Sequence, residues 1–131
     1  MIAVVDDEEC VCIARRRLLR SARFDVETFP SGAAFLESLK SHQPDCAVLD
    51  LHMPGIDGSE VQARLVEAGI RLPIVMVTGD DSPDTRARAL TAGVSAYFLK
   101  PVDGQTLRDA IITAIAHQPD SRPPPAKNQF G

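Results

Sequence analysis

Four short apolar runs in this chain are each followed by a residue with a charged or reactive side chain. The runs are Ile2–Val5, followed by Asp6 and Asp7; Cys46–Leu49, followed by Asp50; Pro73–Val77, followed by Thr78; and Ala96–Leu99, followed by Lys100. Such short runs are typical of buried strands. If the strands are parallel, their carboxyl ends share one edge of the sheet, where open α/β sheets bind their ligands. The pattern therefore predicts a polar site at that edge.

Helical segments separate these runs, and a fifth strand-like segment lies between the first two. Helices are predicted from about Glu8 to Ala22, from Ser31 to Leu39, from Asp57 to Gly69, from Ser82 to Gly93 and over Leu107–Ile115, with the extra strand at Asp25–Phe29. Ser31, Asp57 and Ser82 are typical helix-capping residues. Asp57 and Glu60 also have the spacing of a capping box.

The spacing of apolar residues indicates how firmly each helix should pack. Helical stripes are formed by Val61, Leu65 and Ala68 in the third helix, and by Leu107, Ala110, Ile111, Ala114 and Ile115 in the fifth. The fourth helix carries mainly Ala87, Ala89 and Leu90. We therefore expect the fourth helix to dock weakly.

Alternating strands and helices predict an α/β fold, in which a five-stranded parallel sheet is doubly wound with five helices. The 25–29 strand alternates polar with apolar residues, which suits an edge, whereas the 2–5, 46–50 and 74–78 strands are continuously apolar. Right-handed crossovers then favour the flavodoxin-like strand order 2-1-3-4-5. In that order the first and third strands are neighbours, so their aspartates should meet.

Composition limits the classes of function. The chain has 131 residues, enough for one domain, and 14 basic against 18 acidic residues give a net charge of −4. This balance argues against nonspecific nucleic-acid binding. No apolar stretch has the length of a membrane span, and no signal peptide is recognised, so we expect a cytoplasmic protein. We predict a domain over residues 1–117 and a proline-rich linker or disordered tail over 118–131.

The three cysteines do not form a convincing metal site. Cys10 and Cys12 are two residues apart on a predicted helix and face different directions, and Cys46 lies in a predicted strand. A structural zinc site needs a fourth ligand and closer spacing. We interpret all three as buried, reduced thiols.

Three carboxylates at one sheet edge need a positive partner. Two of them about 5 Å apart repel by roughly 3 kcal/mol at an effective dielectric of about 20. Carboxylate oxygens favour a hard divalent cation such as Mg²⁺, which also binds phosphate oxygens. Lys100 would add a fixed positive charge. A carboxylate, a metal, a lysine and a hydroxyl together suit phosphoryl transfer.

The motifs of the chain resemble those of the receiver domain of bacterial two-component response regulators. The matching segments are DD at 6–7, VLDLHMPGIDG at 48–58, VMVTG at 75–79 and AYFLKP at 96–101, and the resemblance extends from Ile2 to about His117. It implies the receiver version of the flavodoxin-like fold. It also implies a phosphorylated signalling switch that catalyses its own phosphorylation and dephosphorylation, and not a turnover enzyme.

The resemblance implies a role for each polar residue at the sheet edge. Asp50 would accept a phosphoryl group from a sensor histidine kinase or a histidine phosphotransfer protein. Asp7, Asp50 and the backbone carbonyl of His52 would bind Mg²⁺ (or Mn²⁺), and Asp6 would act mainly through a water. Lys100 would contact the acceptor carboxylate and then a phosphoryl oxygen. Similar proteins often have a cis peptide bond after this lysine, before Pro101.

The switch that the resemblance implies involves Thr78 and Tyr97. The Thr78 hydroxyl would move onto the phosphoryl group and give Tyr97 space to rotate inward. This would reshape the face made by the fourth helix, fifth strand and fifth helix, through which the protein could form a homodimer. We also propose that His52 and Asp80 set the lifetime of the phosphoryl group. No nucleic acid or membrane partner is expected for this domain.

Some interpretations stay open. The run Arg15–Arg17 with Arg20 is either a nucleic-acid patch or, in our preferred interpretation, a solvated helix face beside the kinase-docking surface. The chain is either a stand-alone receiver or the input part of a larger regulator. A dehalogenase-like phosphatase would carry its nucleophile after the first strand with a second aspartate two residues on, and a flavodoxin-type module needs a Ser/Thr-rich loop there. Neither pattern is present.

Overall fold

A computed structural model describes residues 1–80 and 82–117, and its elements alternate strictly between strand and helix. They are β1 (Ile2–Val5), α1 (Glu9–Ser21), β2 (Val26–Phe29), α2 (Gly32–Ser38), β3 (Cys46–Asp50), α3 (Gly58–Glu67), β4 (Ile74–Thr78), α4 (Pro83–Thr91), β5 (Ala96–Leu99) and α5 (Gly104–Ala116). The predicted tail over 118–131 lies outside the described residues, so its prediction stays open.

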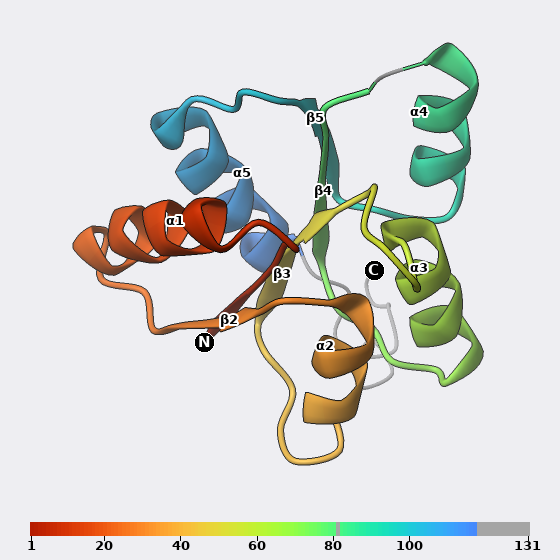
Figure 1. Ribbon diagram of the computed structural model, residues 1–131, viewed down its shortest axis with the longest axis horizontal. Helices are drawn as coiled ribbons and strands as arrows, with labels where there is room; N and C mark the ends of the chain where they lie inside the picture. The colour runs from red at the N-terminus through yellow and green to blue at the C-terminus, as the bar shows by residue number, and fades with distance from the viewer. Residues whose placement is uncertain (81, 118–131) are drawn as a thin grey trace, which may run out of the picture.

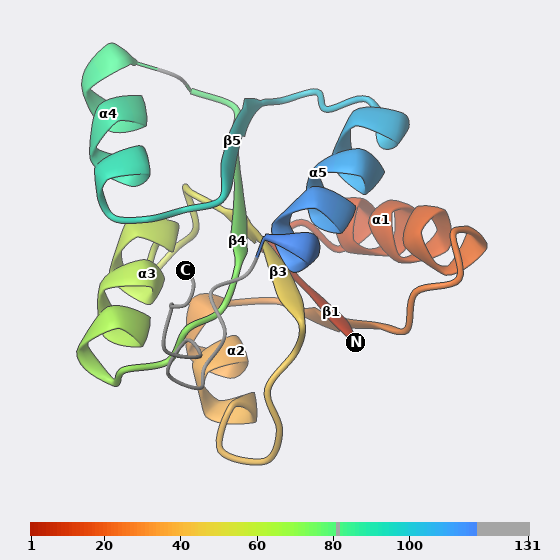
Figure 2. The ribbon, with the colours of Figure 1, turned by 180° about the vertical axis from the view of Figure 1, so that it is seen from behind.

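The sheet has five parallel strands in the order β2-β1-β3-β4-β5, which confirms the predicted fold class and strand order. Helices α1 and α5 lie on one side of the sheet and α2, α3 and α4 on the other, as Figure 1 and the opposite view in Figure 2 show. The 2–5 and 46–50 runs form central strands. The alternating 26–29 segment forms an edge, as predicted.

The strand register aligns the carboxyl ends of four strands. Val5 pairs with Leu49 across β1 and β3, and Thr78 pairs with Leu99 across β4 and β5. The residues that follow these positions therefore leave the sheet at nearly the same level. This register brings together side chains that lie up to 94 positions apart in the sequence.

Two apolar layers hold the helices to the sheet. Alternate residues of the central strands face opposite sides, so Val4 and Val48 pack with α1 and α5, whereas Val5 and Leu49 pack with α2, α3 and α4. All four of these side chains are fully buried. Continuous apolar runs are required here because both faces of each central strand are covered.

The helix starts follow the capping prediction. Backbone N–H groups donate to the side-chain oxygens of Ser31, Asp57 and Ser82 at 3.1, 2.9 and 3.1 Å. The capping box is only half formed, because the Glu60 carboxylate accepts hydrogen bonds from Arg64 at 3.1 and 3.2 Å. Each cap satisfies a backbone donor that the first helical turn leaves free.

Cys10, which was predicted to be buried, is exposed, and so are three apolar residues of the predicted helices: Ala68, Ala87 and Leu90. Cys10 is exposed in the first turn of α1, so the prediction of three buried thiols holds only for Cys12 and Cys46. Ala68 is the C-cap of α3 and follows Leu65, the last buried residue of that helix. On α4, Leu90 is 50% exposed because it follows the buried Ala89 by one residue and so lies about 100° around the helix.

Among residues 1–80 and 82–117, no helix has both the length and the apolar character needed to cross a bilayer. The longest, α1 and α5, have 13 residues each.

Candidate functional site

Three aspartates meet at the carboxyl end of the sheet, where β1 and β3 lie side by side. Carboxylate oxygens of Asp6, Asp7 and Asp50 all lie within 4.8 Å of one another. Asp6 is fully buried, Asp50 is 4% exposed, and Asp7 is exposed to solvent. The cluster therefore has a buried wall and one open side. The predicted meeting of these residues is found in the structure.

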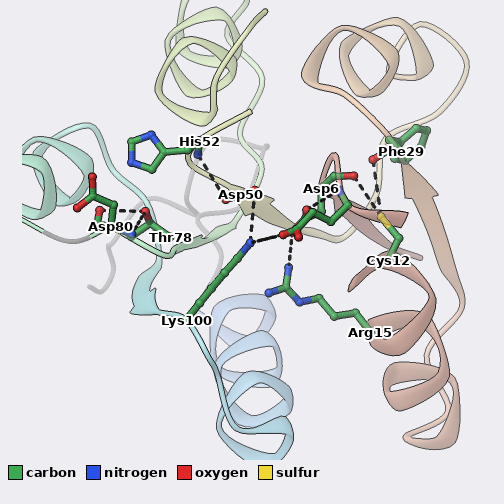
Figure 3. A network of polar contacts seen from close by, with 10 residues as sticks. Asp6, Cys12, Arg15, Phe29, Asp50, His52, Thr78, Asp80 and Lys100 are labelled. Atoms are coloured by element: carbon green, nitrogen blue, oxygen red, sulfur yellow. Dashed lines mark hydrogen bonds and ion pairs between the residues drawn. The ribbon is translucent and has the colours of Figure 1, made fainter. Parts of the chain in front are cut away.

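Lys100 reaches this cluster from the end of β5 (Figure 3). Its Nζ lies 3.2 Å from Asp6 Oδ2, 3.4 Å from Asp50 Oδ2 and 3.8 Å from Glu8 Oε1. The Lys100–Pro101 peptide bond is cis, as the resemblance of the sequence motifs led us to expect. One ammonium group thus contacts both buried carboxylates, which is the geometry required of a group that compensates charge at Asp50.

Burial and neighbouring charges shift the pKa values of this pair. Burial raises the pKa of Asp50 and the nearby Asp6 carboxylate raises it further, while Lys100 lowers it by less. Burial lowers the pKa of Lys100, but Asp50 and Asp6 outweigh it and the net change is upward. Lys100 is therefore firmly cationic at neutral pH. The negative charge of the Asp50 carboxylate is compensated only in part by Lys100. An added cation would therefore favour the ionised form of Asp50.

Asp6 has more partners than the sequence suggested. Its Oδ1 accepts a hydrogen bond from the backbone N–H of Glu8 at 2.9 Å. Its Oδ2 accepts one from Lys100 at 3.2 Å and one from Arg15 at 3.3 Å. Both carboxylate oxygens are thus engaged by protein donors.

Arg15 corrects the interpretation of the basic run as a solvated face. Its side chain is 11% exposed and lies over the buried Asp6, whereas Arg17 is exposed as expected. Cys12, three residues earlier on α1, is buried, and its thiol lies 3.3 Å from the Asp6 carbonyl oxygen. Residues three apart share a helix face. The three-residue spacing between Cys12 and Arg15 is therefore the feature of the sequence that indicates that Arg15 faces the site.

Thr78 lies at the end of β4, fully buried, but its hydroxyl is engaged in the following turn. The hydroxyl donates to the Asp80 carbonyl oxygen at 3.0 Å and accepts from the Asp80 N–H at 3.1 Å. Tyr97 is 6% exposed, with the Arg86 guanidinium 5.0 Å from its ring centroid. Tyr97 is thus already inside, and an inward rotation would have to start from another conformation.

A shallow pocket opens above the aspartates. It is lined by Asp7, Glu8, Asp50, His52, Gly79, Asp80 and Lys100. His52 and Asp80 are exposed at its rim, where the sequence predicted them. Glu8 was not predicted as a site residue, although it directly follows the aspartate pair.

Gly58 is a second residue that the sequence interpretation missed. It starts α3, and its N–H donates to the Leu51 carbonyl oxygen at 2.8 Å. A Cβ atom at this position would lie 2.7 Å from the Asp50 carbonyl oxygen and 2.8 Å from the Leu51 Cα. Both contacts are with backbone, so a side chain would push the acceptor loop away from α3. Glycine is needed here for close approach.

The donor set fits a hard divalent cation. Three carboxylates converge within 4.8 Å, one of them exposed and therefore accessible to a hydrated ion. Oxygen donors of this kind favour Mg²⁺ or Mn²⁺. Arg15 and Lys100, both half-buried, contact Asp6, which leaves the exposed Asp7 as the most accessible ligand of the three.

Comparison with known proteins identifies one family that matches most of the chain. A family model described as the response regulator receiver domain matches residues 2–112. The response regulator protein TmoT of Ectopseudomonas mendocina is 34% identical over 122 residues, which cover 93% of this chain and 56% of TmoT. The transcriptional regulatory protein TdiR of Thauera aromatica is 36% identical over 115 residues, covering 88% of this chain and 51% of TdiR.

Solved structures show the same likeness. The response regulator StyR has a TM-score of 0.79 at 38% identity, covering 89% of this chain and 59% of the StyR chain. FixJ-N has a TM-score of 0.83 at 28% identity, covering 91% of this chain and 95% of that one. The chain spans about half the length of the curated relatives it matches.

Proposed function

The chain belongs to the response regulator receiver domain family of two-component signalling, and from this premise we propose that it is a switch phosphorylated on Asp50. One observation carries the proposal: a nearly buried carboxylate lies beside two further aspartates and 3.4 Å from a lysine ammonium. Few structural roles require four charged groups to meet at a sheet edge. The confirmed resemblance of the motifs supports the same conclusion.

Asp50 acts in this proposal as the nucleophile. Its carboxylate attacks the phosphorus of a phosphohistidine, forming an acyl phosphate and releasing the imidazole of a sensor histidine kinase or a phosphotransfer protein. The His52 N–H, 3.4 Å from Asp50 Oδ1, limits how the carboxylate can turn. Catalysis of this transfer depends mainly on positioning and charge compensation. The protein is then a phosphorylated signalling switch that catalyses its own phosphorylation and dephosphorylation, and not a turnover enzyme.

Asp7, Asp50 and the His52 backbone carbonyl would hold Mg²⁺ or Mn²⁺, with Asp6 acting through a water. When bound, the ion supplies positive charge against the phosphoryl oxygens. Lys100 compensates the Asp50 carboxylate before transfer and can contact a phosphoryl oxygen afterwards. Its position between Asp6 and Asp50 supports this double role.

Thr78, Tyr97 and α4 form the proposed switch. The Thr78 hydroxyl would exchange its hydrogen bonds within the Asp80 turn for a phosphoryl oxygen. Of the described residues of α4, only Ala89 is buried, so this helix can move at low cost. The face formed by α4, β5 and α5 would then bind an output partner or a second copy of the chain.

His52 and Asp80 are proposed to set the lifetime of the acyl phosphate. Both are exposed at the rim of the pocket that contains Asp50. Side chains at the rim can order or exclude the water that hydrolyses the phosphoryl bond. Replacing both should change the rate of dephosphorylation and leave Asp50 as the acceptor.

The experiment that tests the function is phosphorylation with a small phosphodonor. We expect incubation with acetyl phosphate and Mg²⁺ to add the mass of one phosphoryl group, because Asp50 is the one acceptor in the proposed site. The Asp50→Asn variant should gain nothing, and Asp57→Asn, which removes an exposed carboxylate nearby, should react like the wild type. Intact mass spectrometry measures both. A phosphoryl group that persists in Asp50→Asn places the acceptor elsewhere.

A further inference from the structure

Arg15 is the one described cation besides Lys100 that forms an ion pair with the aspartate cluster. It approaches from α1, and Lys100 approaches from the end of β5, as Figure 3 shows. Their nitrogens lie 3.3 and 3.2 Å from the same oxygen, Asp6 Oδ2. A fully buried carboxylate thus has two cations on one atom, which is more than charge compensation of Asp6 requires.

We propose that Arg15 is a positioning residue that acts through Asp6, weakening Mg²⁺ binding at the aspartate cluster and leaving Lys100 available to Asp50. This inference rests on the proposed function, since it concerns the same metal and acceptor. Arg15 touches neither Asp7 nor Asp50 in the described contacts, so its effect passes through one carboxylate.

The effect on the metal follows from charge. Asp6, Asp7 and Asp50 carry three negative charges, and Lys100 balances one of them. Arg15 balances a second, so the cluster attracts a divalent cation less strongly than the carboxylates alone would. The interaction is strong because Arg15 is 11% exposed and Asp6 is fully buried, so water screens it little. Both carboxylate oxygens of Asp6 already accept hydrogen bonds from protein donors. This suits contact with the ion through a water rather than direct binding.

The effect on Lys100 follows from competition for Asp6 Oδ2. The ammonium lies between Asp6 and Asp50 at 3.2 and 3.4 Å, which are nearly equal distances. Without Arg15, Asp6 would attract Lys100 more strongly and draw it from Asp50. With Arg15 present, the Lys100 ammonium can be shared between Asp6 and Asp50. In the proposed function, Lys100 must be free to move its contact from the Asp50 carboxylate to a phosphoryl oxygen.

Magnesium binding measured by calorimetry tests the proposal. At pH 8, with Mg²⁺ as the only ligand, Arg15→Met should bind the ion about fivefold more tightly than the wild type, because one nearby positive charge is lost. Arg15→Lys should restore the wild-type affinity, since it keeps the charge. Arg17→Met is the matched control, because it removes the same charge from an exposed position on α1, and it should change the affinity less than twofold.

The outcomes are distinct. Loss of a purely structural contact would weaken Mg²⁺ binding or leave it unchanged, and either result for Arg15→Met overturns the proposal. An equal increase in Mg²⁺ affinity in Arg15→Met and Arg17→Met also overturns it, since the effect would then come from the change in net charge and not from the contact with Asp6. If Arg15→Met does not fold, Arg15→Gln carries the same expectation. Absence of Mg²⁺ binding in the wild type would instead contradict the proposed function.

Discussion

At the scale of single residues, the site is a balance between buried charges. Asp6 and Asp50 are carboxylates withdrawn from water, and Lys100 is shared between them. Such a cluster is costly in free energy, because like charges close together repel and burial penalises both ionised carboxylates. In the proposed function this cost favours binding of a cation, and it should be measurable as a change in the free energy of unfolding.

Replacing Asp50 should stabilise the metal-free protein. Burial and the Asp6 carboxylate raise the pKa of Asp50 in the folded state. A carboxyl group with a raised folded pKa binds protons better when folded, so its ionised form costs stability above that pKa. Asp50→Asn should therefore raise the free energy of unfolding at pH 7 by about 1 kcal/mol in EDTA. Urea unfolding measures this change.

The gain in stability from Asp50→Asn should depend on pH. Below the unfolded pKa of about 3.9, both states hold the Asp50 proton and the cost vanishes. The gain from Asp50→Asn should therefore shrink as pH falls through the raised pKa. Asp7→Asn, which changes an exposed member of the cluster, should have a much smaller effect. A gain that is the same at low and neutral pH would contradict the assignment to charge.

At the scale of elements, α3 and α4 are similar in length and in their ends but differ in packing. They have 10 and 9 residues, each begins at a capping side chain, and each is followed by a glycine with positive φ. They differ in packing: α3 buries Val61, Gln62 and Leu65, whereas α4 buries only Ala89 among its described residues. Packing against the sheet is the main source of helix stability in a protein.

Amide hydrogen exchange should reveal this difference. We expect the amides of α4 to exchange at least about tenfold faster than those of α3, since fewer buried contacts oppose local opening. Phosphorylation of Asp50 should alter protection in α4 more than in α3, because the proposed switch acts on that helix. Mass spectrometry of peptic fragments provides the measurement. Equal protection of the two helices would contradict the account of α4 as the mobile element.

At the scale of the whole molecule, three large apolar side chains are exposed on the elements of the proposed output face. Leu90 on α4, Leu99 on β5 and Ile112 on α5 are 50%, 47% and 49% exposed. Burying one leucine in an interface is worth roughly 1.5–3 kcal/mol. Residues of this kind favour a protein partner, and a second copy of the chain is the simplest one.

Phosphorylation should shift the protein toward a dimer through this face. Leu99→Glu should weaken the dimer at least about tenfold, because a charge replaces a buried apolar group. Val66→Glu is the control, since Val66 is 62% exposed but lies on α3, away from the face. Sedimentation velocity of the phosphorylated variants compares them. Equal weakening by both changes, or none by Leu99→Glu, would place the interface elsewhere.

The fold class, the strand order and the positions at which the strands end could be predicted from local sequence patterns. Continuous apolar runs demand burial on both faces, and the residues that follow them then share one edge, so the meeting of Asp6, Asp50 and Lys100 follows from the sequence pattern. These features depend on periodicity and on local propensity, which neighbouring residues in the chain encode.

The contacts between side chains inside the site, in contrast, depend on how the helices pack. Arg15 lies in an ordinary basic run, and its contact with Asp6 depends on how α1 rotates over the sheet. Gly58 matters because α3 approaches the acceptor loop closely, and Leu90 is exposed because α4 turns it away. Packing angles of helices arise from contacts between distant segments, and a local pattern does not contain them.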